Sequence, residues 1–80
     1  METMQNETGT ARRWDAGETG CGQLAVGLKR ELAVLNPGER LQVVARNEGA
    51  PVDVPAWCRV TGHHLVHASH PEYVIQRKQS

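Results

Sequence analysis

The residue best suited to chemistry in this 80-residue chain is Cys21, which follows a glycine-rich stretch and precedes a helical apolar pattern. The stretch reads Gly17-Glu18-Thr19-Gly20-Cys21-Gly22. A thiol at a helix start meets backbone N–H groups without helical partners and the positive end of the helix dipole. Both favour the thiolate, which is the form that attacks sulfur or binds metal. The sequence therefore indicates a sulfur nucleophile at Cys21, with Gly20 and Gly22 as flexible backbone around it; an unreactive thiol after a turn is the alternative.

The second cysteine, Cys58, falls on the apolar face of a second predicted helix together with Val54 and Trp57. We expect it to be a small buried hydrophobic residue rather than a second reactive thiol. Neither cysteine belongs to a Cys-x-x-Cys pair, so the sequence gives no sign of a structural zinc site or a thioredoxin-like motif. Two free thiols in a reducing compartment are the expectation.

Four histidines fall within eight residues: His63, His64, His67 and His70. On a regular strand, His63 and His67 would share one face and His64 would point to the opposite one. At most a side-by-side pair and the histidine of the loop would converge, so we expect surface histidines and no metal or other cofactor. A zinc site built from these histidines is the alternative.

Nine basic and nine acidic side chains give the chain a formal net charge of zero. No overall field attracts nucleic acid or an anionic membrane, so we expect no direct nucleic-acid binding. A local basic rim from residues 12–13, 29–30 and 77–78 is an open alternative. The sequence contains neither a membrane-length apolar run nor a secretory signal pattern, which predicts a cytoplasmic protein without membrane contact.

Residues 1–9 are polar and have no apolar periodicity, which predicts a disordered tail. The apolar periodicity of the rest predicts a single domain over residues 10–80. Within the domain we expect a strand over 10–16 with a buried Trp14, then a helix that begins at Cys21, a strand over 41–46, a second helix, and a hairpin of strands 64–68 and 73–77. Gly27 interrupts the leucine stripe of the first helix, so a neighbouring group is expected to need the space of its missing side chain.

The second helix is expected to start with Asp53 as its cap, to hold Pro55 in its first turn and to end at Gly62. Two helices with apolar stripes need a sheet to cover. The sequence thus predicts a two-layer α/β (α+β) sandwich in the order β-α-β-α-β-β, with a four-stranded mixed sheet and two helices on one face. An exposed edge strand and outer sheet face leave a monomer or a weak dimer open.

The second-helix segment, Asp53-Val54-Pro55-Ala56-Trp57-Cys58-Arg59-Val60-Thr61-Gly62-His63, resembles the D-I-P-A-W-C-x-x-T-G-H segment of the TusA family, also called SirA-like, of small sulfur-carrier proteins. Trp14-Asp15-Ala16 and Pro37-Gly38-Glu39 are similar to its first strand and its central turn. By this resemblance, Cys21 occupies the position of the sulfur-accepting cysteine.

The resemblance ends at the cysteine motif, which is Cys-Pro-x-Pro in the family and Cys21-Gly22-Gln23-Leu24 here. Two prolines would fix the helix start and remove N–H groups, whereas Gly22 restores an N–H and loosens the turn. Glu18 stands in place of a family glycine, and its charge would oppose ionisation of a nearby thiol. Asp15 ends the first strand, either hydrogen-bonded into the cysteine loop or facing solvent.

The resemblance implies a sulfurtransferase activity through a Cys21 persulfide. A cysteine desulfurase or a rhodanese-type protein would supply the sulfur, and a downstream carrier or enzyme would accept it. In relatives such relays serve tRNA thiolation, molybdenum-cofactor pathways or sulfur oxidation. A non-catalytic binding or regulatory module that has lost the two prolines is the alternative.

Overall fold

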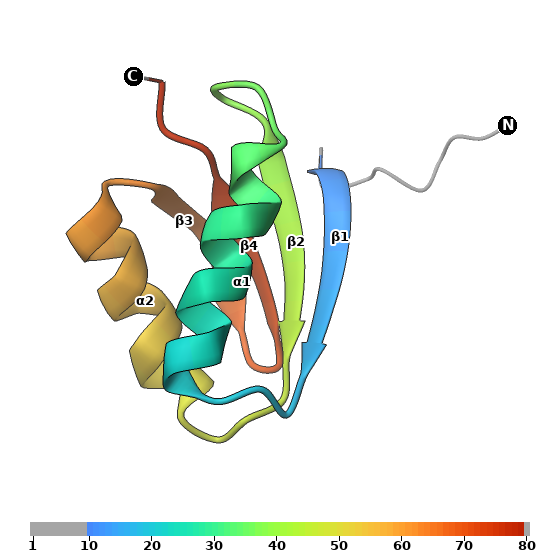
Figure 1. Cartoon of the computed structure of the whole chain (residues 1–80), viewed down its shortest axis with the longest axis vertical. Coiled ribbons are helices and arrows are strands. Elements are labelled where there is room, and N and C mark those ends of the chain that lie inside the picture. The colour runs from blue at the N-terminus through green and yellow to red at the C-terminus, as the bar shows by residue number, and fades with distance from the viewer. Residues whose placement is uncertain (1–9, 80) are drawn as a thin grey trace, which may run out of the picture.

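The computed structural model describes residues 10–79, so the predicted tail over residues 1–9 lies outside the described part of the chain. The elements follow the predicted order (Figure 1): β1 (Thr10–Gly17), α1 (Cys21–Ala33), β2 (Arg40–Ala45), α2 (Ala50–Thr61), β3 (His64–Ser69) and β4 (Glu72–Gln76). The first helix begins at Cys21, which confirms the start that its position after the glycine-rich stretch predicts.

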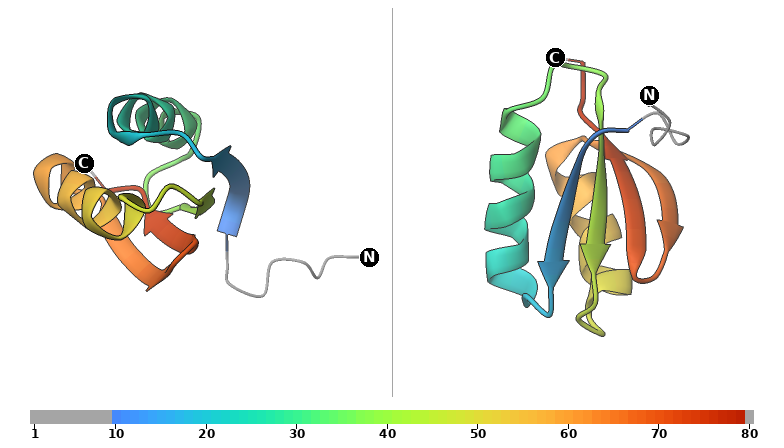
Figure 2. Two further views of the ribbon diagram at one scale, coloured as in Figure 1. Left: turned by 90° about the horizontal axis from the view of Figure 1, so that it is seen from below. Right: turned by 90° about the vertical axis from the view of Figure 1, so that its right-hand side faces the viewer.

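The four strands form one mixed sheet in the order β1-β2-β4-β3. Strands β1 and β2 are parallel because α1 connects them, and the hairpin of β3 and β4 adds two antiparallel pairings. Both helices cover the same face of the sheet, as the view along the layers shows (Figure 2). The predicted two-layer α+β sandwich is therefore confirmed.

The core lies between the two layers. Leu24, Leu28 and Leu32 of α1 are buried, and they pack with buried side chains of the central strands β2 and β4. Each fully buried leucine contributes on the order of 2 kcal/mol through removal of apolar surface from water. Trp14 is only partly buried, not fully as predicted, because β1 is an edge strand and its indole lies at the margin of the core.

The start of α2 differs from the prediction. The helix begins at Ala50, three residues before Asp53, and Gly49 is its N-cap without any side-chain cap. Pro51 fits the first turn because its missing N–H would have no helical partner there. Asp53 is therefore a first-turn residue rather than the cap, and Pro55 lies inside the helix. The C-terminal prediction is correct, since Gly62 ends the helix with a left-handed φ of 88°.

The sequence predicts that His63 and His67 share one face of the strand and that His64 points to the other. This is wrong, because β3 contains an irregularity between Leu65 and His67. His64 pairs with Gln76 and His67 pairs with Val74, and these two partners lie on the same face of β4. The extra residue shifts the alternation, so His64 and His67 share a face. His63 precedes the strand, and its ring stacks on Trp57 of α2 at a centroid distance of 5.3 Å.

Candidate functional site

Cys21 is the first residue of α1, and Gly20 before it has extended backbone angles and serves as the N-cap. The first helical hydrogen bond runs from the N–H of Leu24 to the carbonyl of Gly20, at 2.7 Å. The N–H groups of residues 21–23 consequently have no carbonyl partner within the helix. The first turn also carries no acidic side chain. The backbone at Cys21 thus favours a negative charge.

The two flanking glycines leave open space. Apart from its chain neighbours and the backbone of α1 itself, a Cβ atom built on Gly20 or on Gly22 would meet no atom within 4 Å. Neither position is glycine because of crowding, and a small side chain fits at either one.

A short loop between β1 and α1 carries the chain to Cys21. Gly17 takes a left-handed φ of 59°, which glycine adopts without strain, and the N–H of Thr19 donates to the carbonyl of Ala16 at 3.1 Å. The Asp15 carboxylate accepts a hydrogen bond from the N–H of Gly17 at 2.9 Å. Both predicted environments of Asp15 are present, since its carboxylate bonds to Gly17 at the start of the cysteine loop and its side chain remains 45% exposed.

Asp15 also forms a two-point ion pair with Arg46, the first residue after β2. The two guanidinium nitrogens donate to the two carboxylate oxygens at 2.9 and 3.2 Å. Hydrogen bonds from Arg46 and from the N–H of Gly17 lower the pKa of Asp15 below its ordinary value. Sequence reasoning missed Arg46, because 31 residues separate the pair and only the parallel pairing of β1 with β2 brings them together.

Cys58 lies on the buried face of α2 and is a free thiol. Burial raises the pKa of this thiol to about 11, because the interior disfavours the charged form. The predicted burial is confirmed. At neutral pH the Cys58 sulfur is protonated and shielded, which makes it a poor nucleophile.

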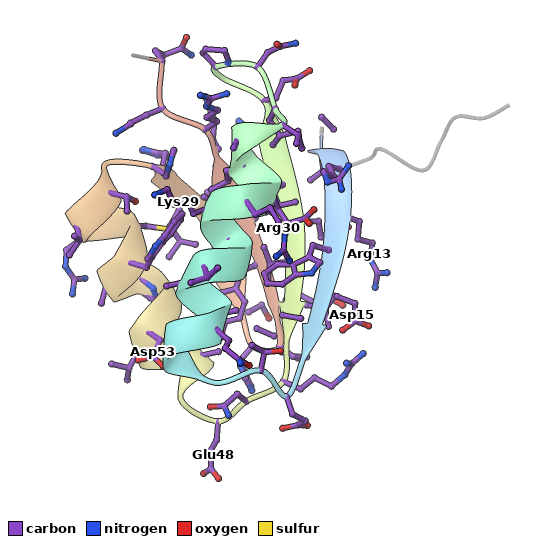
Figure 3. All side chains as sticks on the ribbon, in the orientation of Figure 1. Arg13, Asp15, Lys29, Arg30, Glu48 and Asp53 are labelled. Atoms are coloured by element: carbon purple, nitrogen blue, oxygen red, sulfur yellow. The ribbon has the colours of Figure 1, made fainter. Side chains whose placement is uncertain are left out.

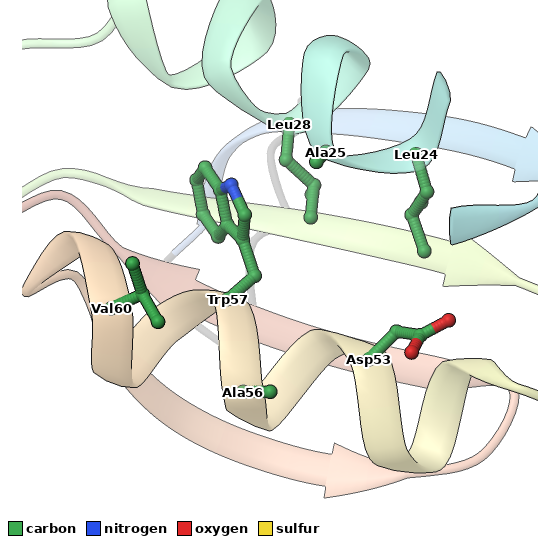
Figure 4. Close-up of a pocket in the computed structure, with 7 residues that line it drawn as sticks. All are labelled: Leu24, Ala25, Leu28, Asp53, Ala56, Trp57 and Val60. Atoms are coloured by element: carbon green, nitrogen blue, oxygen red, sulfur yellow. The ribbon is translucent and has the colours of Figure 1, made fainter. Parts of the chain in front are cut away.

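An apolar groove runs between α1 and α2, beginning one turn beyond Cys21 (Figure 4). Its first hollow has a volume of about 240 Å³ and is lined mainly by Leu24, Leu28, Trp57 and Val60. An adjoining hollow of about 520 Å³ continues past Val26 toward the other end of the helices. Val26 and Val60 are 63% and 85% exposed at its rim. The two hollows together form a mainly apolar surface between the helices.

The far end of this groove is basic. Lys29 projects from α1 on the side of α2 (Figure 3), and Lys78 lines the same hollow. Within the described residues 10–79, no carboxylate lies within 4 Å of either ammonium group. Burial, and then the positive charges of Lys78 and Arg77, lower the pKa of His63 beside them. The groove thus joins an apolar floor to a cationic end.

The histidines do not converge. In the part of the chain that the structure describes, no three histidine, cysteine or acidic side chains lie close enough together to hold a metal ion. His64 and His67 lie on β3, while His70 lies in the hairpin turn, where its Nδ1 is 2.8 Å from the Tyr73 hydroxyl. Neither of the two described helices is long and apolar enough to cross a membrane.

These features define a class of protein: a small two-layer α+β domain in which a helix begins with a cysteine and an apolar groove starts one turn further on. The chain belongs to the TusA sulfurtransferase family, because the family model described as "Sulfurtransferase TusA" matches residues 13–77. This range includes β1 from residue 13 onward, both helices, β2 and the hairpin. The family resemblance seen in the sequence is therefore confirmed.

Two curated relatives come from Neisseria meningitidis, one from serogroup A and one from serogroup B, and their names describe them as inferred sulfur carrier proteins. Each is 46% identical to this chain over 47 residues. The match covers 59% of this chain and 64% of each relative, so it spans less than two thirds of their length.

Proposed function

We propose that this protein is a sulfur carrier that accepts a sulfane sulfur on Cys21 and passes it to a downstream thiol. The observation that carries the proposal is the place of Cys21 as the first residue of α1, next to N–H groups without helical partners. Those groups favour a thiolate, and they favour the anionic persulfide formed from it for the same reason. The family membership supports the same role.

The chemistry is a pair of thiol exchanges. The Cys21 thiolate attacks the outer sulfur of a donor persulfide, so that the donor's S–S bond breaks and the donor leaves as a thiolate. A new S–S bond now holds the sulfane sulfur on Cys21. An acceptor thiolate then attacks this outer sulfur and releases the Cys21 thiolate. No net oxidation occurs in either step, and neither step requires a metal or an organic cofactor.

The groove between α1 and α2 is the surface on which we expect a partner protein to bind. Its occupant is a protein segment that places apolar side chains over Val26 and Val60 and a carboxylate near Lys29 and Lys78. The charge of the groove argues for this partner, because its cationic end has no acidic neighbour among residues 10–79. Because Leu24 lines the groove one turn from Cys21, a bound segment would bring its reacting sulfur close to the helix start.

A cysteine desulfurase or a rhodanese-type protein is the proposed donor, and a second carrier or a thiolating enzyme is the proposed acceptor. We place the relay in the cytoplasm, where thiols remain reduced. Thiolation of tRNA, molybdenum-cofactor synthesis and sulfur oxidation are the pathways to which such a carrier would deliver sulfur.

Mass spectrometry after incubation with a cysteine desulfurase and cysteine tests the proposal. We expect a mass increase of one sulfur atom that persists in Cys58→Ala and disappears in Cys21→Ser. A dithiothreitol wash should remove the added mass, which separates a persulfide from irreversible oxidation. Labelling confined to Cys58 would contradict the proposal.

The second candidate is a non-catalytic binding module, and Gly22 in place of the first proline of the family motif favours it. This candidate predicts no sulfur adduct with a desulfurase or a rhodanese-type donor. It also predicts that iodoacetamide alkylates Cys21 with the pH dependence of an ordinary thiol, whose pKa is about 8.5. Alkylation that saturates at clearly lower pH supports the carrier instead.

A further inference from the structure

The loop between β2 and α2 lies against the loop that carries Cys21 and is bonded to it at two backbone positions. The N–H of Arg46 donates to the carbonyl of Gly17 at 2.7 Å. The Asn47 side chain donates to the carbonyl of Glu18 at 3.2 Å, and its own oxygen accepts the N–H of Gly49 at 2.8 Å. Asn47 therefore links the cysteine loop to the N-cap of α2.

The guanidinium of Arg46 fixes the same loop from its outer side. It holds both oxygens of Asp15, and one of these oxygens also accepts the N–H of Gly17. Gly17 is thus hydrogen-bonded at its carbonyl by the Arg46 backbone and at its N–H by the carboxylate that Arg46 holds. Both charged side chains are about half exposed, so their pair contributes little to global stability. Its effect is to restrict one loop.

Arg46 also balances charge near the helix start. Among residues 17–20 and 46–49, which form the two loops, it is the one cation. The hydrogen bond to Asp15 raises the pKa of Arg46, and the negative charges of Asp15 and, to a smaller extent, of Glu18 raise it further. The charged and titratable groups on the segments around the cysteine loop are Arg13, Asp15, Glu18, Arg46, Glu48, Asp53 and His70, and the charge of Arg13 also acts on Asp15. Four of these are acidic, so loss of Arg46 leaves a negative environment.

We propose that Arg46 is a positioning residue for Cys21: together with Asn47 it holds the cysteine loop in place, and its charge offsets that of Glu18. This inference rests on the proposed sulfur-carrier role. It would account for a chain that carries a glutamate three residues before the proposed sulfur acceptor while that cysteine stays ionisable. A negative Glu18 without its cationic neighbour would disfavour a thiolate or persulfide at the start of α1.

The test is the rate of iodoacetamide alkylation of Cys21 as a function of pH, in a Cys58→Ala background. In Arg46→Gln we expect the rate at pH 7 to fall on the order of three- to tenfold, with the apparent pKa of Cys21 raised. Arg46→Lys should retain most of the rate, because it keeps the charge. Adding Glu18→Gln to Arg46→Gln should restore the rate. Arg59→Gln, in the last turn of α2, is the matched control and should change nothing.

Three results would overturn the inference: an unchanged pH profile in Arg46→Gln, an equal loss in Arg59→Gln, or no recovery when Glu18 is also neutralised. Circular dichroism should show that every variant is folded, since the ion pair is half exposed. The alkylation assay needs no sulfur donor. Failure of the parent protein to form a persulfide would therefore contradict the proposed function, while the alkylation series would still decide the role of Arg46.

Discussion

The indole of Trp14 occupies the space that a side chain at position 27 would need. A Cβ atom built on Gly27 would lie 2.2 Å from Cη2 of Trp14 and 2.5 Å from its Cζ2. The edge strand β1 and the helix α1 thus approach each other closely at this point. The prediction that a neighbouring group requires a glycine in this helix is confirmed, and the group is the tryptophan of β1.

Gly27→Ala is expected to destabilise the protein although alanine is the better helix former. Alanine is more favourable than glycine inside a helix by about 1 kcal/mol. Displacing the packed indole of Trp14, however, costs about 1 to 3 kcal/mol. We expect a net loss of about 1 kcal/mol in the free energy of unfolding, measured by urea denaturation. Gly22→Ala is the matched control in the same helix, because its Cβ meets nothing within 4 Å. That variant should be unchanged or more stable, and equal losses in both variants would refute the role of Trp14.

Because the thiol of Cys58 is buried, we expect the protein to lose stability at high pH. Its pKa is about 11 in the folded protein and about 8.5 in an unfolded chain. The unfolded state therefore releases a proton first, so stability is complete below about pH 8.5 and declines as the pH rises toward 11. Near pH 11 the decline reaches about 2 to 3 kcal/mol. Urea denaturation from pH 8 to 10.5, with Cys21→Ser as the parent, should show this decline, and adding Cys58→Ala should remove most of it. The rest belongs in part to Tyr73, because burial raises its pKa as well. Parallel pH curves for the two proteins would contradict the burial of an un-ionised thiol.

The helical leucines, the order of helices and strands along the chain and the need for a glycine at position 27 could be predicted because each leaves a signal in the local sequence pattern. The start of α2 could not, since Asp53 and Pro51 both suit a helix start and only packing chooses between them. The irregularity in β3 depends on its pairing with β4, which the strand's own residues do not encode. Arg46 was missed for a related reason. Its partner Asp15 is distant in sequence, and an arginine after a strand resembles any solvated surface charge.

His63 is expected to report acidification through the fluorescence of Trp57, on which its ring stacks. The Nδ1 atom of His63 accepts the N–H of Lys78 at 3.1 Å, and this acceptor is lost when the ring is protonated. Its pKa lies below the ordinary value, chiefly through burial and then through the charges of Lys78 and Arg77. The unfolded chain binds this proton first as the pH falls below about 6.5, so this contribution to stability is lost in acid. A fluorescence change with a midpoint below 6.5 is expected, and His63→Gln should abolish it. A midpoint at or above 6.5 would contradict the environment described.

Lys29 is expected to strengthen association with a sulfur donor through its charge. Lys29→Glu should raise the KM for a cysteine desulfurase persulfide by about three- to tenfold at low ionic strength, and less at 0.5 M salt, where charges are screened. Arg30→Glu is the control, since Arg30 is the next residue of α1 and lines neither hollow of the groove but a separate hollow beside Trp14. Steady-state sulfur transfer at several donor concentrations measures the effect. Equal changes in both variants would mean that net charge, rather than the groove, governs association.

Val60 gives the sharpest test of the groove, because it is highly exposed and yet lines both hollows. Val60→Asp should change the free energy of unfolding by less than about 0.5 kcal/mol, as for other surface substitutions. It should raise the KM for the donor by about tenfold, since it puts a charge where apolar side chains must pack. Val52→Asp is the matched control: it is 72% exposed on the same helix but outside the groove lining. Iodoacetamide should alkylate Cys21 equally fast in both variants. If Cys21 is alkylated more slowly in Val60→Asp, the substitution disturbs the start of α1. If the KM for the donor rises while the alkylation rate is unchanged, the groove is a partner-binding surface.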